Sequence, residues 1–199
     1  MQKEAKKPAR KLAYMPIRDD GETTALFEPL LISESSKHRT RLSDLALELA
    51  TRSEGLRRSL PASIAAALAD LVRSMNCYYS NLIEGHNTHP IDIERALNDD
   101  YSADPEKRNL QLEAKAHITV QKWIDDGELK DHPTSSEALR EIHRRFCELL
   151  PKELLFVEDP TTGEKVEVVP GALRERDVQV GRHVAISPGA VPRFLERMS

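Results

Sequence analysis

Apolar residues recur at helical spacing over most of the chain between residues 34 and 150. A first helix, over about 34–60, is predicted by leucines three, four or seven positions apart: Leu42, Leu45, Leu49 and Leu56. A longer helix is predicted over about 61–85, because Pro61 suits a first helical turn and Gly85 suits a left-handed cap. Its apolar stripe comprises Ile64, Leu68, Leu71, Val72, Met75, Tyr79 and Leu82.

Three further helices are predicted before residue 150. One runs over about 90–97, and one begins at Asp104-Pro105 and ends at Gly127. A capping box formed by Thr134 and Glu137 predicts the start of the third. Its apolar face comprises Leu139, Ile142, Phe146 and Leu149.

The pattern changes to short strands after Pro151. Residues 154–157 and 165–169 flank the turn signal of residues 160–163, and alternating apolar positions over 178–186 predict another strand. A last helix is expected from about Val191. We therefore predict a mainly α fold with one small β-hairpin over about 154–186. Three regions are expected: a basic, extended tail and arm over 1–33, a helical region over 34–104, and a region over 105–199 that contains the hairpin.

Composition indicates an ordinary soluble domain. Of the 199 residues, 31% are charged and the net charge is −4, which argues against a general nucleic-acid binder and leaves a DNA-associated helical protein as a weak alternative. No apolar run approaches the ~18 residues of a membrane span, and no signal peptide is apparent. Cys77 and Cys147 form no CxxC pair, so we expect buried free thiols and a cytoplasmic protein without a membrane partner.

The end of the long helix carries the first candidate motif, Ser80-Asn-Leu-Ile-Glu84-Gly85. Ser80 and Glu84 are four residues apart and share a helix face. The helix dipole disfavours a carboxylate in the last turn, and an arginine from elsewhere would reverse that balance through two hydrogen bonds. The alternative is an exposed glutamate of no particular role. His86 and His89 nearby could be metal ligands, but a loop without further ligands is the simpler interpretation.

A second motif lies downstream, in the segment from Pro170 to Val184. Its defining residues are Gly171, Arg174, Val178, Val180 and Gly181. Together, the two motifs resemble the Fic family, whose members transfer AMP from ATP to hydroxyl groups of proteins. In that family an inhibitory helix reads (Ser/Thr)-x-x-x-Glu-(Gly/Asn), and a β-hairpin flap with a Gly-x-x-Arg and Val-x-Val-Gly pattern follows it. The resemblance covers residues from about 60 to 199.

The resemblance implies the N-terminal portion of a Fic-like helical bundle. Glu84 would pair with an arginine of the catalytic motif and so hold ATP in a non-productive pose, with Ser80 and Gly85 completing the inhibitory motif. The flap would dock a protein substrate by β-strand addition. ATP and Mg²⁺ would serve the intact enzyme. The family's catalytic sequence His-Pro-Phe-x-x-Gly-Asn-Gly-Arg does not occur in these 199 residues, so they supply no catalytic residue and no metal ligand.

Two arrangements are compatible with that absence. In the first, the chain is the regulatory and target-docking part of a class II enzyme whose catalytic portion is expected further along the natural protein, which leaves this part inactive alone and without bound cofactor. Alternatively, it is a stand-alone helical module that acts in trans on a catalytic Fic chain. In either case we expect self-association, or a rearranged packing that hides Leu68, Val72 and Met75.

Overall fold

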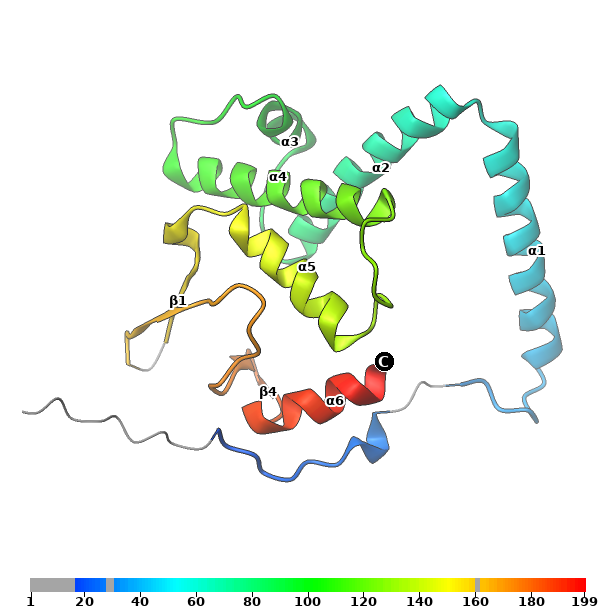
Figure 1. Cartoon of the computed structure of the whole chain (residues 1–199). Helices are drawn as coiled ribbons and strands as arrows, with labels where there is room; N and C mark the ends of the chain where they lie inside the picture. Colours follow the sequence, from blue (N-terminus) through cyan, green and yellow to red (C-terminus); the bar gives the residue numbers. More distant parts are fainter. Residues whose placement is uncertain (1–16, 28–30, 160–161) are drawn as a thin grey trace, which may run out of the picture.

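The computed structural model describes residues 17–27, 31–159 and 162–199, and helices dominate them (Figure 1). The α-helices are α1 (Arg39–Ser59), α2 (Ala62–Ile83), α3 (Pro90–Leu97), α4 (Pro105–Asp125), α5 (Ser136–Glu148) and α6 (Val191–Met198). Short 3-10 helices cover Thr24–Leu26 (η1), Lys152–Leu154 (η2) and Pro188–Ala190 (η3). The prediction of a mainly α fold is confirmed, and each predicted helix is present.

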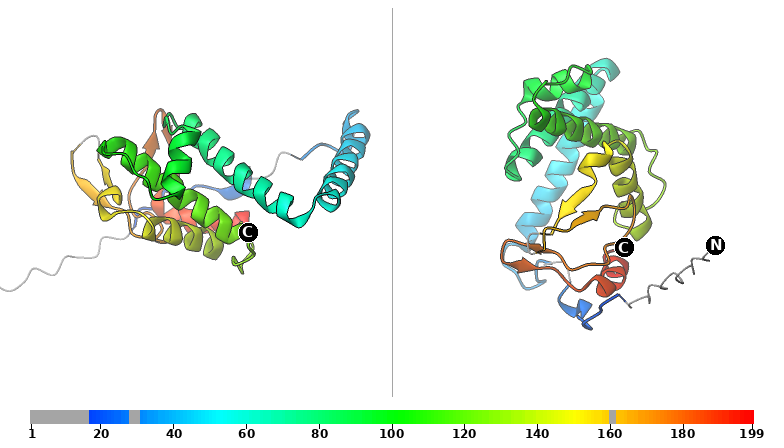
Figure 2. Two further views of the ribbon diagram at one scale, coloured as in Figure 1. Left: turned by 90° about the horizontal axis from the view of Figure 1, so that it is seen from above. Right: turned by 90° about the vertical axis from the view of Figure 1, so that its left-hand side faces the viewer.

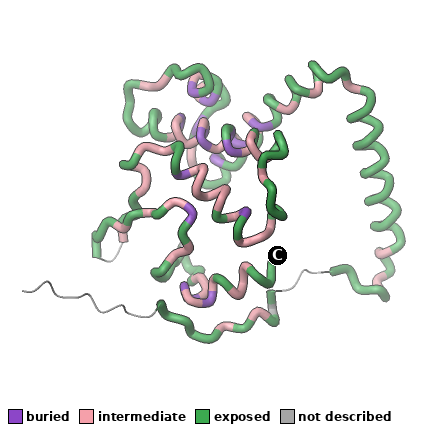
Figure 3. Tube along the Cα trace, in the orientation of Figure 1, coloured by how far each residue is buried: buried purple, intermediate pink, exposed green. Residues whose placement is uncertain are grey.

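The core lies where α2, α3 and α4 meet. Its fully or nearly buried members are Cys77 of α2, Ile93 of α3, and Ala114 and Ile118 of α4, with Tyr78 packed against them. Helix α5 packs on α4, and α6 packs on α5, so the helices form successive layers (Figure 1). Buried positions gather in the α2–α4 region when the chain is coloured by burial (Figure 3). Both cysteines are buried free thiols, as predicted.

Helix α2 packs on a different face from the one its apolar stripe predicts. The buried residues are Arg73, Cys77 and Asn81, which recur every four positions and face the core. The leucines at 68, 71 and 82 are exposed on the other side. Arg73 can be buried because its guanidinium donates to Asp70 (2.5 Å) and Asp125 (2.8 Å). Small and hydrogen-bonded side chains therefore decide the packing, and the stripe is left uncovered.

The start of α5 corrects the predicted capping box. Ser135, rather than Thr134, is the N-cap, and its hydroxyl accepts a hydrogen bond from the Ala138 N–H at 3.1 Å. The Thr134 hydroxyl lies 2.9 Å from Nδ1 of His132 instead. A serine and a threonine in succession offer the same capping chemistry, so the sequence alone does not separate them.

Two separate hairpins replace the single hairpin predicted over 154–186. Strand β1 (Phe156–Glu158) pairs with β2 (Lys165–Glu167), and β3 (Gln179–Val180) pairs with β4 (His183–Val184), both antiparallel. The two pairs form different sheets. The strand predicted over 178–186 is wrong because Gly181 adopts φ +58° and reverses the chain. A two-residue turn preserves the alternation of apolar positions, so the pattern looks continuous.

An N-terminal arm crosses the C-terminal end of the fold. Residues 17–27 lie along η3 and α6, and the ring of Phe27 packs 5.6 Å from that of Phe194 (Figure 1). The Gly189 N–H donates to the Arg18 carbonyl at 2.8 Å, and a Cβ at Gly189 would lie 2.9 Å from that oxygen. Only glycine therefore fits at this crossing.

Helix α1 contrasts with the rest of the fold because none of its 21 residues is buried. It leaves the helical body at the Leu60-Pro61 corner and stays clear of it in the view from above (Figure 2). Within the described ranges, no helix is both long and apolar enough to cross a membrane.

Candidate functional site

The end of α2 holds Glu84 in a defined backbone geometry. Glu84 is the C-cap, and its N–H donates to the Ser80 carbonyl at 3.2 Å. Gly85 follows with φ +83°, and its N–H donates to Leu82 at 3.1 Å while that of His86 donates to Asn81 at 2.8 Å. These two bonds form a Schellman motif, which satisfies carbonyls that a helix end leaves open. The prediction of a left-handed glycine cap at Gly85 is confirmed.

The loop after Gly85 is fastened to the helix by buried polar side chains. The Asn81 amide lies 3.5 Å from the Thr88 hydroxyl, and both residues are buried. Nδ1 of His86 lies 3.8 Å from the Glu113 carboxylate of α4. The chain therefore turns at a fixed position, and the Glu84 backbone is fixed with it.

The Glu84 carboxylate itself is exposed and has no counter-charge in the described part of the chain. The last turn of α2 contains no basic residue. No hydrogen bond or ion pair joins the Glu84 or Ser80 side chain to any residue within 17–27, 31–159 or 162–199. The partial negative charge of the helix end disfavours this anion, and an external cation would offset that cost.

The predicted flap residues divide into anchors and an exposed hairpin. Gly171 is buried against α5: its N–H donates to His143 (2.9 Å), and its carbonyl accepts from Arg140 (2.8 Å). With φ +73°, a Cβ at this position would meet the Arg140 carbonyl and the Arg144 side chain at 3.1 Å. Gly171 therefore joins the flap segment to the helical body and lies outside the hairpin.

Arg174 closes the loop that carries the hairpin. Its guanidinium donates to the carbonyls of Arg176 (2.9 Å) and Ile186 (2.5 Å), on the two limbs of that loop. Beyond it, the Ala185 N–H donates to the Val178 carbonyl at 2.9 Å. Arg174 thus sets the shape of the loop through main-chain contacts.

The β3–β4 hairpin forms the exposed tip. The register pairs Gln179 with Val184 and Val180 with His183, and Gly181 makes the turn. Val178 and His183 are exposed. This sheet has two strands in the described part of the chain, so each strand keeps an outer edge that another strand can pair with.

The two predicted sets of residues lie on elements that pack on different neighbours. Helix α2 packs on α3 and α4, whereas the hairpin segment is anchored on α5 and joined to α6. No hydrogen bond between described residues links positions 80–85 to positions 171–181. Figure 1 shows the end of α2 behind α4 and the hairpin near α6. The structure therefore presents two separate candidate surfaces.

A polar cluster that sequence reasoning missed fastens the arm beside the hairpin. The Glu22 carboxylate accepts from the N–H (2.5 Å) and the hydroxyl (2.7 Å) of Ser187, and Asp19 pairs with Arg193. Arg18 reaches Asp177 at 2.8 Å. The Ser187 N–H lowers the pKa of Glu22, and the Arg193 guanidinium lowers that of Asp19. No sequence signal joins residues about 165 positions apart, so only the fold shows this cluster.

Burial shifts the pKa values of two reactive side chains elsewhere in the fold. Burial raises the pKa of Cys77 to about 11, so its thiol stays protonated near neutral pH and is a poor nucleophile. Burial also lowers the pKa of His117. In the residues that the structure describes, no three His, Cys, Asp or Glu side chains are grouped so that they could hold a metal ion.

Comparison of the chain with models of protein families, with curated proteins and with solved structures finds no match. A function can therefore be inferred only from the two motifs and from the geometry of the residues that form them.

Proposed function

We propose that this chain is the regulatory and target-docking portion of a Fic-type protein adenylyltransferase, with Glu84 as the autoinhibitory carboxylate. The catalytic polypeptide would carry the His-Pro-Phe-x-x-Gly-Asn-Gly-Arg sequence and bind ATP with Mg²⁺. In this scheme the chain alone does not transfer AMP.

The exposed Glu84 carboxylate is the observation that carries the proposal. Its backbone is held by the Schellman motif, and no described cation neutralises its charge. A carboxylate in such a position binds an arginine readily, because bidentate pairing adds two charge-assisted hydrogen bonds and offsets the unfavourable helix end. An arginine held in this way is withheld from a nucleotide phosphate, which explains inhibition.

The β3–β4 hairpin supplies the docking function in this proposal. Its outer edges offer main-chain N–H and C=O groups to an extended segment of a target protein. Gly171 and Arg174 act as positioning residues, since they fasten the hairpin segment to α5 and close its loop. The hairpin favours the docking role over a purely inhibitory module in trans, which has no need of a target-binding edge.

The test measures AMP transfer from labelled ATP by the assembly of this chain with its catalytic polypeptide. Glu84→Gly is expected to raise auto-adenylylation at least about tenfold, the size of a lost charge-assisted ion pair of roughly 1.4 kcal/mol or more. Asp126→Gly is the matched control, because Asp126 is also an acidic C-cap before a glycine. Equal rates for the wild type and Glu84→Gly would refute the inhibitory role.

The genomic context gives an independent test. The reading frame of this chain, or a neighbouring gene, is expected to encode the His-Pro-Phe-x-x-Gly-Asn-Gly-Arg sequence. A neighbouring gene would favour action in trans, and a continuous frame would favour action within one polypeptide. Absence from both would refute the assignment.

A further inference from the structure

Helix α1 has an apolar face that none of the described residues covers. Its predicted stripe lies on one side of the helix and is 40% to 67% exposed, at Leu42, Leu45, Leu49 and Leu56. The charged side chains beside it are largely paired within the helix, as in Glu48–Arg52 (2.6 Å) and Glu54–Arg58 (2.8 Å). Most of the stability of a helix in a protein comes from packing of its apolar face, so this 21-residue helix is expected to pack on a partner.

The outer face of α2 is the second uncovered surface. It is opposite the row of Arg73, Cys77 and Asn81 that packs on the core. Its members are 42% to 56% exposed, at Ile64, Leu68, Leu71, Tyr79 and Leu82. Two long helices joined in sequence thus expose apolar faces of similar length. Each is a suitable partner for the other, because leucine-rich stripes at three- and four-residue spacing interlock along antiparallel or parallel helices.

In this structure α1 does not pack along the α2 of its own chain. Only Leu60 and Pro61 link α1 to α2, and both have extended backbones, with ψ of 129° and 144°. Proline restricts its own φ and disfavours a helical conformation in the residue before it. The corner is therefore held open, and α1 points away from the α2 to which it is joined (Figure 2).

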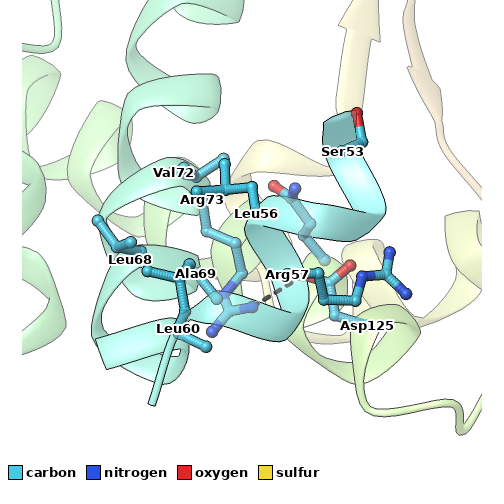
Figure 4. A pocket seen from close by; sticks show the side chains of 11 residues that line it. Ser53, Leu56, Arg57, Leu60, Leu68, Ala69, Val72, Arg73 and Asp125 are labelled. Carbon is cyan, nitrogen blue, oxygen red and sulfur yellow. Dashed lines mark hydrogen bonds and ion pairs between the residues drawn. The ribbon is translucent and has the colours of Figure 1, made fainter. Parts of the chain in front are cut away.

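A hollow at the inner side of this corner is lined by both helices. Its lining includes Leu56 of α1, Leu60 of the corner, and Leu68, Val72 and Arg73 of α2, together with Asp125 of α4 (Figure 4). The hollow shows that the two apolar faces are continuous across the corner. A helix from a second copy that packs along α2 would therefore contact the apolar faces of both α1 and α2.

We propose that two copies of the chain exchange α1 helices, so that α1 of each copy packs on the outer face of α2 of the other. The exchange covers both faces in both copies and closes by two-fold symmetry. Summed over both copies, the exposed surface of the apolar residues named above on α1 and α2 is on the order of 1,500 Å², close to the ~1,600 Å² that a stable protein interface buries in total. This assignment does not depend on the proposed function, and it specifies the helix that covers the predicted α2 stripe.

Light scattering during size-exclusion chromatography of the full chain tests the exchange. The wild type is expected to elute at twice the chain mass of 22.5 kDa. The double variant Leu45→Glu, Leu49→Glu is expected to elute as a monomer, because it places charge in the buried seam. Leu47→Glu is the matched control: Leu47 is on the opposite side of α1 and is 70% exposed, so this variant should remain a dimer. Far-ultraviolet circular dichroism verifies that each variant keeps its helices.

A longer link between α1 and α2 distinguishes the exchange of helices from other modes of association. Six Gly and Ser residues inserted between Leu60 and Pro61 let each α1 fold back on its own α2, so this variant is expected to be monomeric with unchanged helix content. A monomeric wild type would refute the proposal. So would a dimer that survives both the double glutamate change and the insertion.

Discussion

Helices α2 and α4 both end in an acidic C-cap followed by glycine, but only α4 has a basic residue in its last turn. Helix α2 ends in Glu84-Gly85 and α4 in Asp126-Gly127, with both glycines at positive φ. In α4, the Gly127 N–H donates to Ile124 at 3.0 Å and that of Glu128 to Trp123 at 3.3 Å, which repeats the bond pattern at Gly85 and His86. The two ends therefore share a backbone motif.

The two helix ends differ in the charges that surround their acidic caps. Lys122, in the last turn of α4, binds the Asp126 carboxylate at 2.8 Å and also interacts favourably with the helix end. The last turn of α2 has no basic residue, and no described cation reaches Glu84. Among the described residues, a counter-charge is present at the end of α4 and absent at the end of α2. An acidic cap is thus unremarkable by itself, and the missing local cation is what distinguishes Glu84.

Replacing the cap glycines tests whether the two ends share one backbone. Gly85→Ala and Gly127→Ala are each expected to lower the free energy of unfolding by about 1–2 kcal/mol, the cost of a left-handed conformation for an L-residue. A Cβ at either position meets no atom within 4 Å, so backbone strain is the whole effect. Urea denaturation measures both variants. If the two variants lose amounts of unfolding free energy that differ by more than the expected backbone strain, the two helix ends are not equivalent.

The arm offers a third kind of carboxylate, one whose partners come from a distant segment. The pKa values of Asp19 and Glu22 lie below their ordinary values of 3.8 and 4.5. Their contribution to arm binding is therefore full above about pH 4.5 and is lost as the pH falls through the lowered values.

Hydrogen exchange of the Ser187 and Gly189 amides measures that release. After correction for intrinsic rates, their exchange is expected to accelerate several-fold between pH 6 and pH 3, roughly the range over which a carboxylate is protonated. The Ala138 amide, which donates to the uncharged Ser135 hydroxyl, is the internal control. Equal acceleration at all three amides would indicate general unfolding and contradict a separate arm.

Neutralising the caps gives the smallest effect and tests the comparison most directly. Glu84→Gln is expected to stabilise the fold by a few tenths of a kcal/mol, because it removes a charge that the helix end disfavours. Asp126→Asn is expected to be neutral or slightly destabilising, because it also removes the Lys122 ion pair. Thermal denaturation at low and high salt should show the difference shrinking as salt rises. The same sign for both variants would show that Lys122 does not distinguish the two ends.

Local signals predicted the local structure well. Pro90, Pro105, Gly85 and Gly127 mark element ends because their backbone preferences act within a few residues. The division of the predicted single hairpin into two hairpins was missed, since a tight turn leaves the alternation of apolar positions intact. Of the candidate site, the position of Glu84 at a helix end was predictable, whereas the buried, anchoring place of Gly171 was not.

By itself, the sequence determined which segments are helical, where they end, and that α2 carries an acidic cap with no basic residue in its last turn. These properties depend on residues within one or two turns of each other. The tertiary structure alone decided which face of α2 is buried, that α1 extends freely from a proline corner, and that the arm fastens beside the hairpin. Those outcomes depend on close packing between residues far apart in the chain, where a small side chain or a satisfied arginine outweighs an apolar stripe.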